Sequence, residues 1–281
     1  MEEGKFSKTA NRVAIRRAAH QLLDQPKVLD DPLALRIIGS EAAEDLRSNP
    51  KEHHVFSRAF RAFMAARSRY AEDELARGVS QGVRQYVVLG AGLDTFAYRN
   101  PHPSLSIFEV DHPSTQVWKL EQLEAAHISV PPSLTFVPID FELQTLADGL
   151  AQAGFNGNAG AFFSWLGVTP YLTREACMMT LDFIAKMPAG SGVVFDFAVD
   201  PALLNPGQRQ ALAALSKRVA RYGEPFQLFF DPAKLQDELK ALGFNRTEFL
   251  QGKELNARYF KDRTDGLLVR GGLGHLMSAW V

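Results

Sequence analysis

A glycine-containing loop follows the first run of residues that is typical of a buried strand. Residues 86–89 are aromatic or aliphatic, and they lead directly into Gly90, Ala91 and Gly92. Glycines permit a tight turn and let the backbone approach a ligand, as at the first strand end of a doubly wound sheet. Thr95 stands where a dinucleotide fingerprint has its third glycine or alanine, so the loop disfavours a dinucleotide pyrophosphate. The alternative is an ordinary turn between a strand and a helix.

Two acidic residues end the next two strand-like runs. Asp111 lies about 20 positions after the glycine loop, where a carboxylate accepts hydrogen bonds from ribose hydroxyls. Asp140 is placed to accept from the exocyclic amine of adenine, with the backbone N–H of Phe141 bonding a ring nitrogen. Each acid has an alternative as the N-cap of the helix that follows it. We expect Glu109 to make mainly a fold or loop contact.

Four side chains are candidates for a general base, and the sequence singles out none of them. His275, Tyr171, His20 and His112 carry groups that can accept a proton. His275 lies near the expected last strand, where a structural role is its alternative, and His112 has the alternative of starting a helix. The single cysteine, Cys177, cannot form an internal disulfide, and no Cys/His spacing resembles a zinc site. We therefore expect no metal.

The elements that must position these residues change character near residue 85. Residues 8–78 read as helices, with a helix start at Asp30-Asp31-Pro32 and a long helix near 57–78. From residue 85 strand-like runs alternate with helical segments, which predicts an α/β fold with a parallel sheet and helices on both faces. The expected strands lie at about 86–89, 105–110, 134–137, 161–165, 192–197, 245–250 and 275–281. The expected helices between them lie at about 114–126, 142–153, 173–187, 207–222 and 232–242.

Composition excludes several classes of function. The chain has 281 residues, a hydrophobic fraction of 46% and a formal net charge of −1, with an isoelectric point of about 6.7. A nucleic-acid-binding protein is more often clearly basic, so we expect no nucleic-acid partner. The absence of an apolar run of about 18 residues and of an apolar leader predicts a cytoplasmic protein without a membrane partner. Nothing in the sequence predicts the oligomeric state.

The three strand ends taken together resemble those of the leucine carboxyl methyltransferase family, including its bacterial S-adenosyl-L-methionine-dependent group. The resemblance implies a class I, Rossmann-like fold with a seven-stranded, mostly parallel sheet and one antiparallel strand. It implies S-adenosyl-L-methionine as the cofactor. It also implies that Arg67 pairs with the cofactor's methionine carboxylate; the rival is Arg69, and the alternative is a solvated helix charge. The motifs that carry it are Leu89 to Thr95, Phe108 to Pro113 and Asp140-Phe141, with weaker matches at Thr9-Ala10, Asp30 to Pro32, Ala66 to Arg69, Gly167-Val168, Tyr171-Leu172 and His275 to Ala279.

The chain departs from the family pattern at the fourth strand end. The family usually has an acidic residue just before the glycine there, near the cofactor's amino group, and this chain has Leu166. Trp165 or Tyr171 is a candidate to lie near the sulfonium instead, since an aromatic face attracts a cation. The alternative for either ring is a buried place in the core.

These observations predict an S-adenosyl-L-methionine-dependent O-methyltransferase acting on a carboxylate or hydroxyl of a small molecule. A carboxylate is ionised at neutral pH and needs no base, whereas an alcohol needs one. Residues 1–80 are expected to form a helical lid and residues 81–281 the cofactor-binding core, with a lid insertion at 200–231. The rivals are an NAD(P)-dependent oxidoreductase and a non-catalytic protein that binds S-adenosyl-L-methionine.

Overall fold

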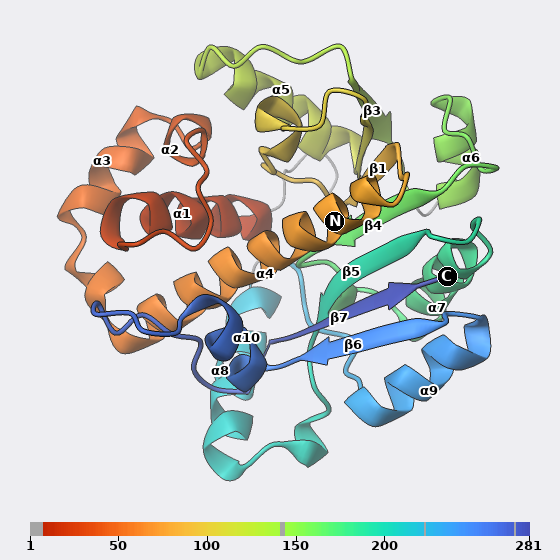
Figure 1. Ribbon diagram of the computed structural model, residues 1–281. Coiled ribbons are helices and arrows are strands. Elements are labelled where there is room, and N and C mark those ends of the chain that lie inside the picture. The colour runs from red at the N-terminus through yellow and green to blue at the C-terminus, as the bar shows by residue number, and fades with distance from the viewer. Residues whose placement is uncertain (1–7, 141–143, 222, 273) are drawn as a thin grey trace.

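Seven short strands pair into one sheet in the order β3-β2-β1-β4-β5-β7-β6 (Figure 1). The computed structural model describes residues 8–140, 144–221, 223–272 and 274–281. All neighbouring strands are parallel except at β7, which is antiparallel to both β5 and β6. The seven-stranded, mostly parallel sheet is thus confirmed. The strands are β1 (Gln85–Leu89), β2 (Ser106–Asp111), β3 (Leu134–Pro138), β4 (Ala161–Trp165), β5 (Gly192–Phe197), β6 (Arg246–Leu250) and β7 (His275–Trp280).

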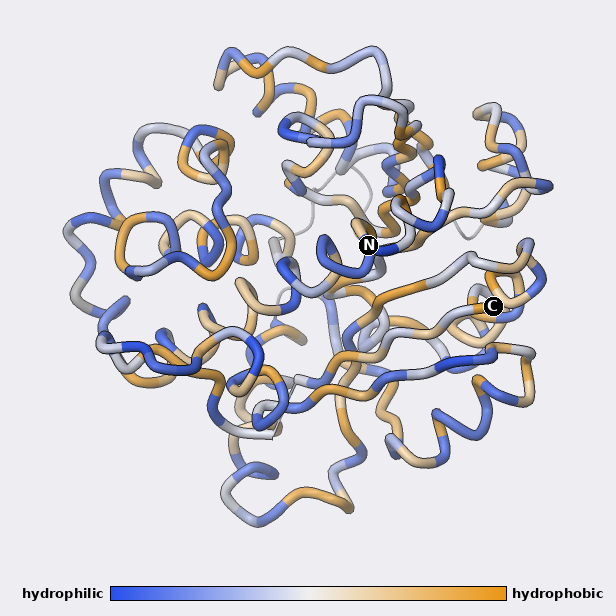
Figure 2. The backbone as a smooth tube through the Cα atoms, in the orientation of Figure 1, coloured by the Kyte–Doolittle hydropathy of each residue, from blue (hydrophilic) through white to orange (hydrophobic). Residues whose placement is uncertain are grey.

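Strands β1, β4, β5 and β7 are buried over their whole length because both faces of the sheet are covered there. Side chains alternate between two cores along each strand. On β5, Phe195 and Phe197 enter one core, and Val194 enters the other together with residues of the longest helix. Figure 2 shows hydrophobic segments running through the middle of the molecule, where the strands lie. Burial on both faces explains why apolar runs predicted these strands.

Helices cover both faces and extend past one edge of the sheet. Figure 1 shows α1, α2 and α3 gathered on the side toward which the parallel strands point, with α4 running from them across the sheet. Their arrangement places the N-terminal helices beside the strand ends that carry the expected site. The helices are α1 (Lys8–Leu23), α2 (Ala34–Ile37), α3 (Ser40–Ser48), α4 (Val55–Ser80), α5 (Pro113–Ala125), α6 (Leu146–Gln152), α7 (Arg174–Ala185), α8 (Pro206–Ala220), α9 (Pro232–Leu242) and α10 (Gly252–Tyr259).

Helix α4 is the element that connects the N-terminal helices to the sheet. Its 26 residues include many alanines, which favour a helix and let it pack closely on its neighbours. It ends at Ser80, and β1 begins at Gln85, so a short connection joins the helix to the first strand. No helix in the described ranges is long and apolar enough to cross a membrane. The long helix expected near 57–78 is present and slightly longer.

Three helix expectations need correction. The start expected at Asp30-Asp31-Pro32 is wrong, because α2 begins at Ala34 and ends at Ile37, before Gly39 with a φ of +84°. The helix expected over 142–153 begins later in its described part, at Leu146, because Thr145 caps it by accepting from the Asp148 N–H at 3.2 Å. Helices α3 and α10 were not expected as separate elements. Each is short, so its apolar periodicity spans few turns.

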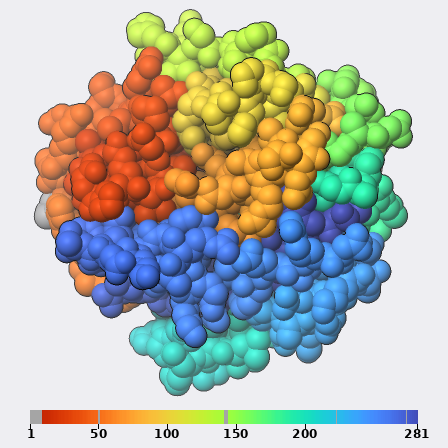
Figure 3. All heavy atoms as spheres, viewed as in Figure 1, coloured from red at the N-terminus to blue at the C-terminus, as the bar shows by residue number. Residues whose placement is uncertain are grey.

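The N-terminal helices also contact a late segment of the chain. Arg263, which follows α10, donates to the backbone oxygen of Pro26 at 2.5 Å. Figure 3 shows these early and late segments side by side on one face of the molecule. On α4, Phe63 packs so closely on Gly274 that a Cβ there would lie 2.5 Å from the ring. The segment before β7 and the first half of α4 are therefore packed against each other.

Candidate functional site

The glycine loop turns sharply at the end of β1 and is held by the end of β2. Gly90 and Gly92 have φ values of +68° and +46°, a region that glycine adopts without strain. The N–H groups of Gly90 and Ala91 both donate to the backbone oxygen of Val110, at 2.8 and 3.1 Å. The loop therefore lies directly beside the residue that precedes Asp111. Of the three residues only Gly90 is exposed, and the absence of a Cβ at Gly90 and Gly92 lets Val168 and Ala10 pack closely on the turn.

Asp111 is fixed by two backbone donors. One carboxylate oxygen accepts from the Gly92 N–H at 2.6 Å, and the other accepts from the His112 N–H at 2.7 Å. Burial raises the pKa of Asp111 above its usual range, and these two N–H groups act in the opposite direction. A carboxylate has about four lone-pair positions, so two remain for hydroxyl donors. The side chain is thus oriented by the glycine loop and keeps capacity for a ligand.

Asp140 lies at the end of the neighbouring strand, at nearly the same level of the sheet. The N–H of Ile139 donates to the backbone oxygen of Asp111 at 2.9 Å, which joins the two strand ends. Asp140 is half-buried. Phe141, expected to contribute a backbone N–H, lies outside the described residues. The structure therefore brings Gly90, Ala91, Gly92, Asp111 and Asp140 to one edge of the sheet.

Arg67 reaches the same edge from α4 and meets an acid that sequence reasoning missed. Arg67 is 5% exposed, and its Nη1 donates to Asp196, the fifth residue of β5. Gly167 N–H donates to the other oxygen of Asp196 at 2.5 Å. A Cβ on Gly167 would lie 3.0 Å from Arg67, so this glycine makes room for the guanidinium. An acid inside the apolar run Val193 to Phe197 is the signal that could have identified it, because a buried charge requires a partner.

The rival arginine lies elsewhere. Arg69 is exposed and its Nε donates to Asp73, four residues along the same helix, at 2.7 Å. Trp165 faces the opposite side of the sheet from Arg67, where it packs in the core with its ring 6.3 Å from that of Phe195. Leu166 is half-buried against the core that includes α4. Of these residues, only Arg67 joins the candidate site.

Tyr171 lies near Arg67 and Asp196, beyond the end of β4. Burial raises the pKa of Tyr171 to about 12, a hydrogen bond with Thr9 acts against this rise, and Asp196 and Arg67 also act on it electrostatically. Thr9 also donates to Glu224, and the Tyr171 ring lies 5.3 Å from that of Phe226. The first turn of α1 and the segment after α8 therefore meet beside Tyr171.

The three histidine candidates lie in other surroundings. His275 is 5% exposed and stacks against Phe197 and Phe249, with ring centroids 5.9 and 5.3 Å away. Its pKa is lowered to about 4, because burial disfavours the charged ring, while Glu254 acts in the opposite direction. His275 pairs with Phe197 on β5 and shares its face, so it lies on the other side of the sheet from Arg67.

His20 and His112 are held by local hydrogen bonds. His20 is buried in α1, with Nδ1 2.9 Å from Asp24 and Nε2 accepting from the Val28 N–H at 2.9 Å. His112 caps α5, its ring nitrogen accepting from the Ser114 N–H at 3.3 Å. Both rings thus serve the local fold. In the ranges that the structure describes, no three His, Cys, Asp or Glu residues gather in a way that could hold a metal ion.

Glu109 forms a buried ion pair behind Asp111. It is 0% exposed, and its carboxylate lies 2.6 Å from Lys119 Nζ on α5. Burial raises the pKa of Glu109 to about 7, and Lys119 acts in the opposite direction. The Lys119 ammonium also lies 5.4 Å from the centre of the Tyr98 ring. Glu109 therefore joins α5 to β2, which is a contact within the fold.

Helix α1 is attached directly to the glycine loop. Arg17 Nη2 donates to Asp31 at 2.8 Å and to the Thr95 hydroxyl at 2.7 Å, and Thr95 donates to Asp31 at 2.7 Å. A Cβ on Gly92 would lie 3.0 Å from Ala10, so the first turn of α1 lies against the loop. Thr95, which departs from a dinucleotide fingerprint, thus serves to connect the loop to the N-terminal helices.

Comparison with known proteins gives one family. A sequence profile of the leucine carboxyl methyltransferase family matches residues 10–185. A Bacillus subtilis protein, YktD, named provisionally as an S-adenosyl-L-methionine-dependent methyltransferase, is 33% identical over 95% of each chain. A Mycolicibacterium vanbaalenii protein with the same provisional description is 32% identical over 96% of this chain and 90% of its own. A solved structure from Thermobifida fusca, described provisionally as a methyltransferase, covers 99% of this chain and 96% of its own with a TM-score of 0.57 at 16% identity.

Proposed function

The chain belongs to the leucine carboxyl methyltransferase family, and we propose that this S-adenosyl-L-methionine-dependent methyltransferase acts on an oxygen of a small molecule, with a carboxylate as the acceptor. The proposal depends on which residues could hold the cofactor and which could serve as a base. The residues that could hold the cofactor lie at the sheet edge around Asp111, and the candidates for a base are Tyr171 and His275.

The residues at the sheet edge fit the cofactor. A loop with two glycines, two carboxylates at adjacent strand ends and a buried arginine match a nucleoside joined to an amino acid. Arg67 Nε is buried without a hydrogen-bond partner among the described residues, so the guanidinium keeps a free donor. In our proposal Asp111 would accept from the ribose hydroxyls, Asp140 from the adenine amine, and Arg67 would donate to the carboxylate.

The properties of the two candidate bases favour an acceptor that arrives as an anion. The cofactor supplies a methyl group on a sulfonium, which an oxygen nucleophile attacks directly. Tyr171 holds its proton up to a pH of about 12, and His275, with a pKa of about 4, is a weak base on the other side of the sheet. An alcohol needs a base of matched pKa in the transition state, whereas a carboxylate is already ionised. The choice of a carboxylate is supported by the position of His275 on the other side of the sheet, together with the raised pKa of Tyr171.

We also propose that residues 1–80 and 200–231 cover the acceptor side of the site, above the core formed by residues 81–281. Thr9 contacts both Glu224 and Tyr171, and Ala10 lies against Gly92. The segment after α8 returns over the end of β4, with the Gln227 N–H donating to Pro170 at 2.7 Å. Such a cover would align the acceptor with the methyl group and exclude water, which are the main tasks in a direct displacement.

An acceptor panel tests the choice of atom. The enzyme would be incubated with S-adenosyl-L-methionine and pairs of carboxylic acids and alcohols that share one carbon skeleton, with S-adenosylhomocysteine and the methylated product measured by mass spectrometry. We expect methyl esters from the acids, with kcat/KM nearly constant from about pH 6 to 9, because the acceptor stays ionised across that range. Ethers from the alcohols, at a rate that rises with pH, would contradict the proposal.

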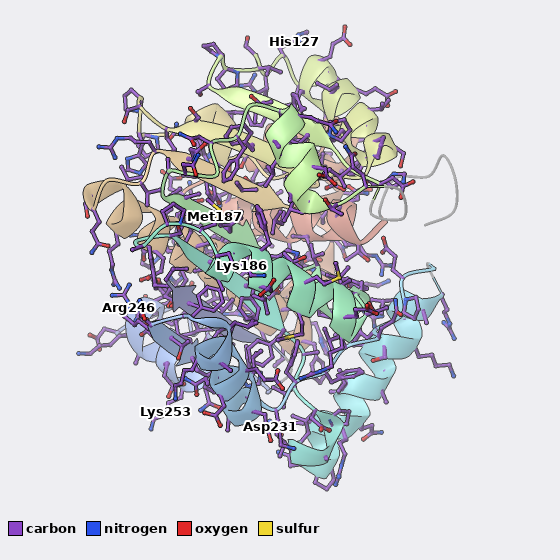
Figure 4. All side chains as sticks on the ribbon, turned by 90° about the vertical axis from the view of Figure 1, so that its right-hand side faces the viewer. His127, Lys186, Met187, Asp231, Arg246 and Lys253 are labelled. Carbon is purple, nitrogen blue, oxygen red and sulfur yellow. The ribbon has the colours of Figure 1, made fainter. Side chains whose placement is uncertain are left out.

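Calorimetry with S-adenosylhomocysteine tests the ribose contact. Asp111→Asn keeps the shape and one carbonyl acceptor for Gly92, so we expect a loss of affinity of about 10-fold to 100-fold without unfolding. The matched control is Asp231→Asn at the start of α9 (Figure 4), another aspartate that accepts from two backbone N–H groups. Asp231 is the last residue of the proposed 200–231 cover, and its carboxylate bonds the first turn of α9 and none of the described residues at the sheet edge, so this variant should bind S-adenosylhomocysteine normally. Equal affinities for the two variants would argue against the assignment of Asp111.

A further inference from the structure

A buried pair of opposite charges joins the end of β5 to the middle of α4, and the proposed function uses only its positive half. Arg67 and Asp196 are 5% and 6% exposed and are in direct contact. The Gly167 N–H fixes the second carboxylate oxygen at 2.5 Å, and the Thr169 hydroxyl donates to the backbone oxygen of Asp196 at 2.6 Å. Three elements thus hold one carboxylate beside one guanidinium.

Both members of the pair keep unused hydrogen-bonding capacity. Arg67 has five N–H donors, and its Nε is buried without a partner among the residues described. Asp196 has about four lone-pair positions, of which Arg67 and Gly167 occupy two. A ligand that carries a carboxylate and an ammonium on one carbon atom would satisfy both groups. Because Arg67 and Asp196 already neutralise each other, a ligand with a single charge would add an uncompensated charge to the pair.

The register of the sheet places Asp196 beside the position where the chain lacks an acid. Trp165 on β4 pairs with Phe195 on β5, so the next residue on each strand, Leu166 and Asp196, lies at the same level. The backbone N–H of Gly167, the residue after Leu166, donates to the Asp196 carboxylate. A negative charge is therefore present at this strand end, and it is supplied by β5 in place of β4.

We propose that Asp196 binds the α-ammonium of the cofactor's methionine end, so that Arg67 and Asp196 together recognise its zwitterionic group. The proposal rests on the proposed function, because it concerns the same cofactor. In this arrangement Arg67 binds the carboxylate and Asp196 binds the ammonium, so each side chain faces a ligand group of opposite charge. The apolar Leu166 then needs no polar role at this edge.

The test compares two ligands that differ only in the ammonium. S-adenosylhomocysteine and its desamino analogue, which keeps the carboxylate and carries hydrogen in place of the amino group, are titrated into the full chain by calorimetry. We expect Asp196→Asn to weaken S-adenosylhomocysteine by about 10-fold to 100-fold and to leave the analogue nearly unchanged. The wild-type preference for the natural ligand should therefore disappear in the variant.

The matched control is Asp24→Asn, which removes another buried aspartate that is paired with an arginine. Asp24 is 2% exposed and accepts from Arg61 at 2.7 and 2.9 Å, within the N-terminal helices. This variant should keep the wild-type preference between the two ligands. If Asp196→Asn weakens both ligands equally, or neither, Asp196 has only a structural role and the inference is wrong.

A structure of the wild-type complex decides the matter if Asp196→Asn does not fold. Crystals with S-adenosylhomocysteine should show the ammonium about 3 Å from the Asp196 carboxylate. An ammonium bonded only to backbone carbonyls or to another side chain would overturn the inference while leaving the proposed function intact. A wild-type protein that does not bind S-adenosylhomocysteine at all would overturn both.

Discussion

Replacing His275 by phenylalanine should make the fold less sensitive to acid. The ring is stacked between Phe197 and Phe249, and burial lowers its pKa from 6.5 to about 4. In the unfolded chain the ring takes up a proton below a pH of about 6.5, whereas in the folded chain it does so only below about 4. The folded state therefore loses stability as the pH falls through this window, and above it the ring has no effect.

The size of the effect follows from the two pKa values. At pH 5 the unfolded ring is almost fully protonated and the folded ring is about nine-tenths neutral, which lowers the free energy of unfolding by about 2 kcal/mol relative to pH 7.5. Urea unfolding of the wild type and His275→Phe at both pH values would measure it, with other groups cancelling in the comparison. Methyl transfer by the variant should persist, because the ring lies on the far side of the sheet from Arg67. Equal losses of stability in the two proteins between pH 7.5 and pH 5 would refute this reasoning.

Two further variants test the glycine loop and its attachment. Gly90→Ala should lower the free energy of unfolding, measured by urea titration, by at least about 1–3 kcal/mol. The φ of Gly90 is +68°, and a Cβ added there would lie 2.3 Å from Val168. The control Gly157→Ala, with open space around the added Cβ, should change the free energy of unfolding little. Arg17→Met should lower the free energy of unfolding by about 3–5 kcal/mol, because it leaves the buried charge of Asp31 partly uncompensated. If the N-terminal helices cover the site, the same variant should also bind S-adenosylhomocysteine more weakly in calorimetry. Unchanged binding by a folded Arg17→Met protein would count against that cover.

The inner strands of the sheet were predictable because they are buried on both faces. Such strands are continuous apolar runs, and residues 86–89 and 192–197 need little context to be identified. The glycine loop and Asp111 follow from the same logic, since parallel strands bring their carboxyl ends to one edge. Short helices such as α3 were harder, because nine residues hold few turns from which to read a period.

The remaining features depend on contacts between distant parts of the chain. Asp31 reads locally as a helix start, yet it is fully buried and bonded to Thr95, 64 residues away. Asp196 is an acid within an otherwise apolar strand, and its partner, Arg67, lies 129 residues earlier in the chain. Asp196 displays the need for a partner in the sequence itself, as a carboxylate within an apolar strand, and burial of that charge requires a cation nearby. The sequence therefore predicts that a partner exists and leaves its identity to the fold.

If Arg67 binds the cofactor as we propose, the N-terminal helices and the sheet act together in binding. Arg67 belongs to α4, within residues 1–80, while its partner Asp196 belongs to β5 in the core. Residues 81–281 alone would contain Asp111 and Asp140 but would leave Asp196 buried without its arginine. A ligand that contacts Arg67, Asp196 and Asp111 at once binds only when the helices are docked on the sheet. Such a ligand would stabilise the docked state by mass action, by about 2.7 kcal/mol at a concentration 100 times its Kd, so in our proposal cofactor binding and docking of the helices are one equilibrium.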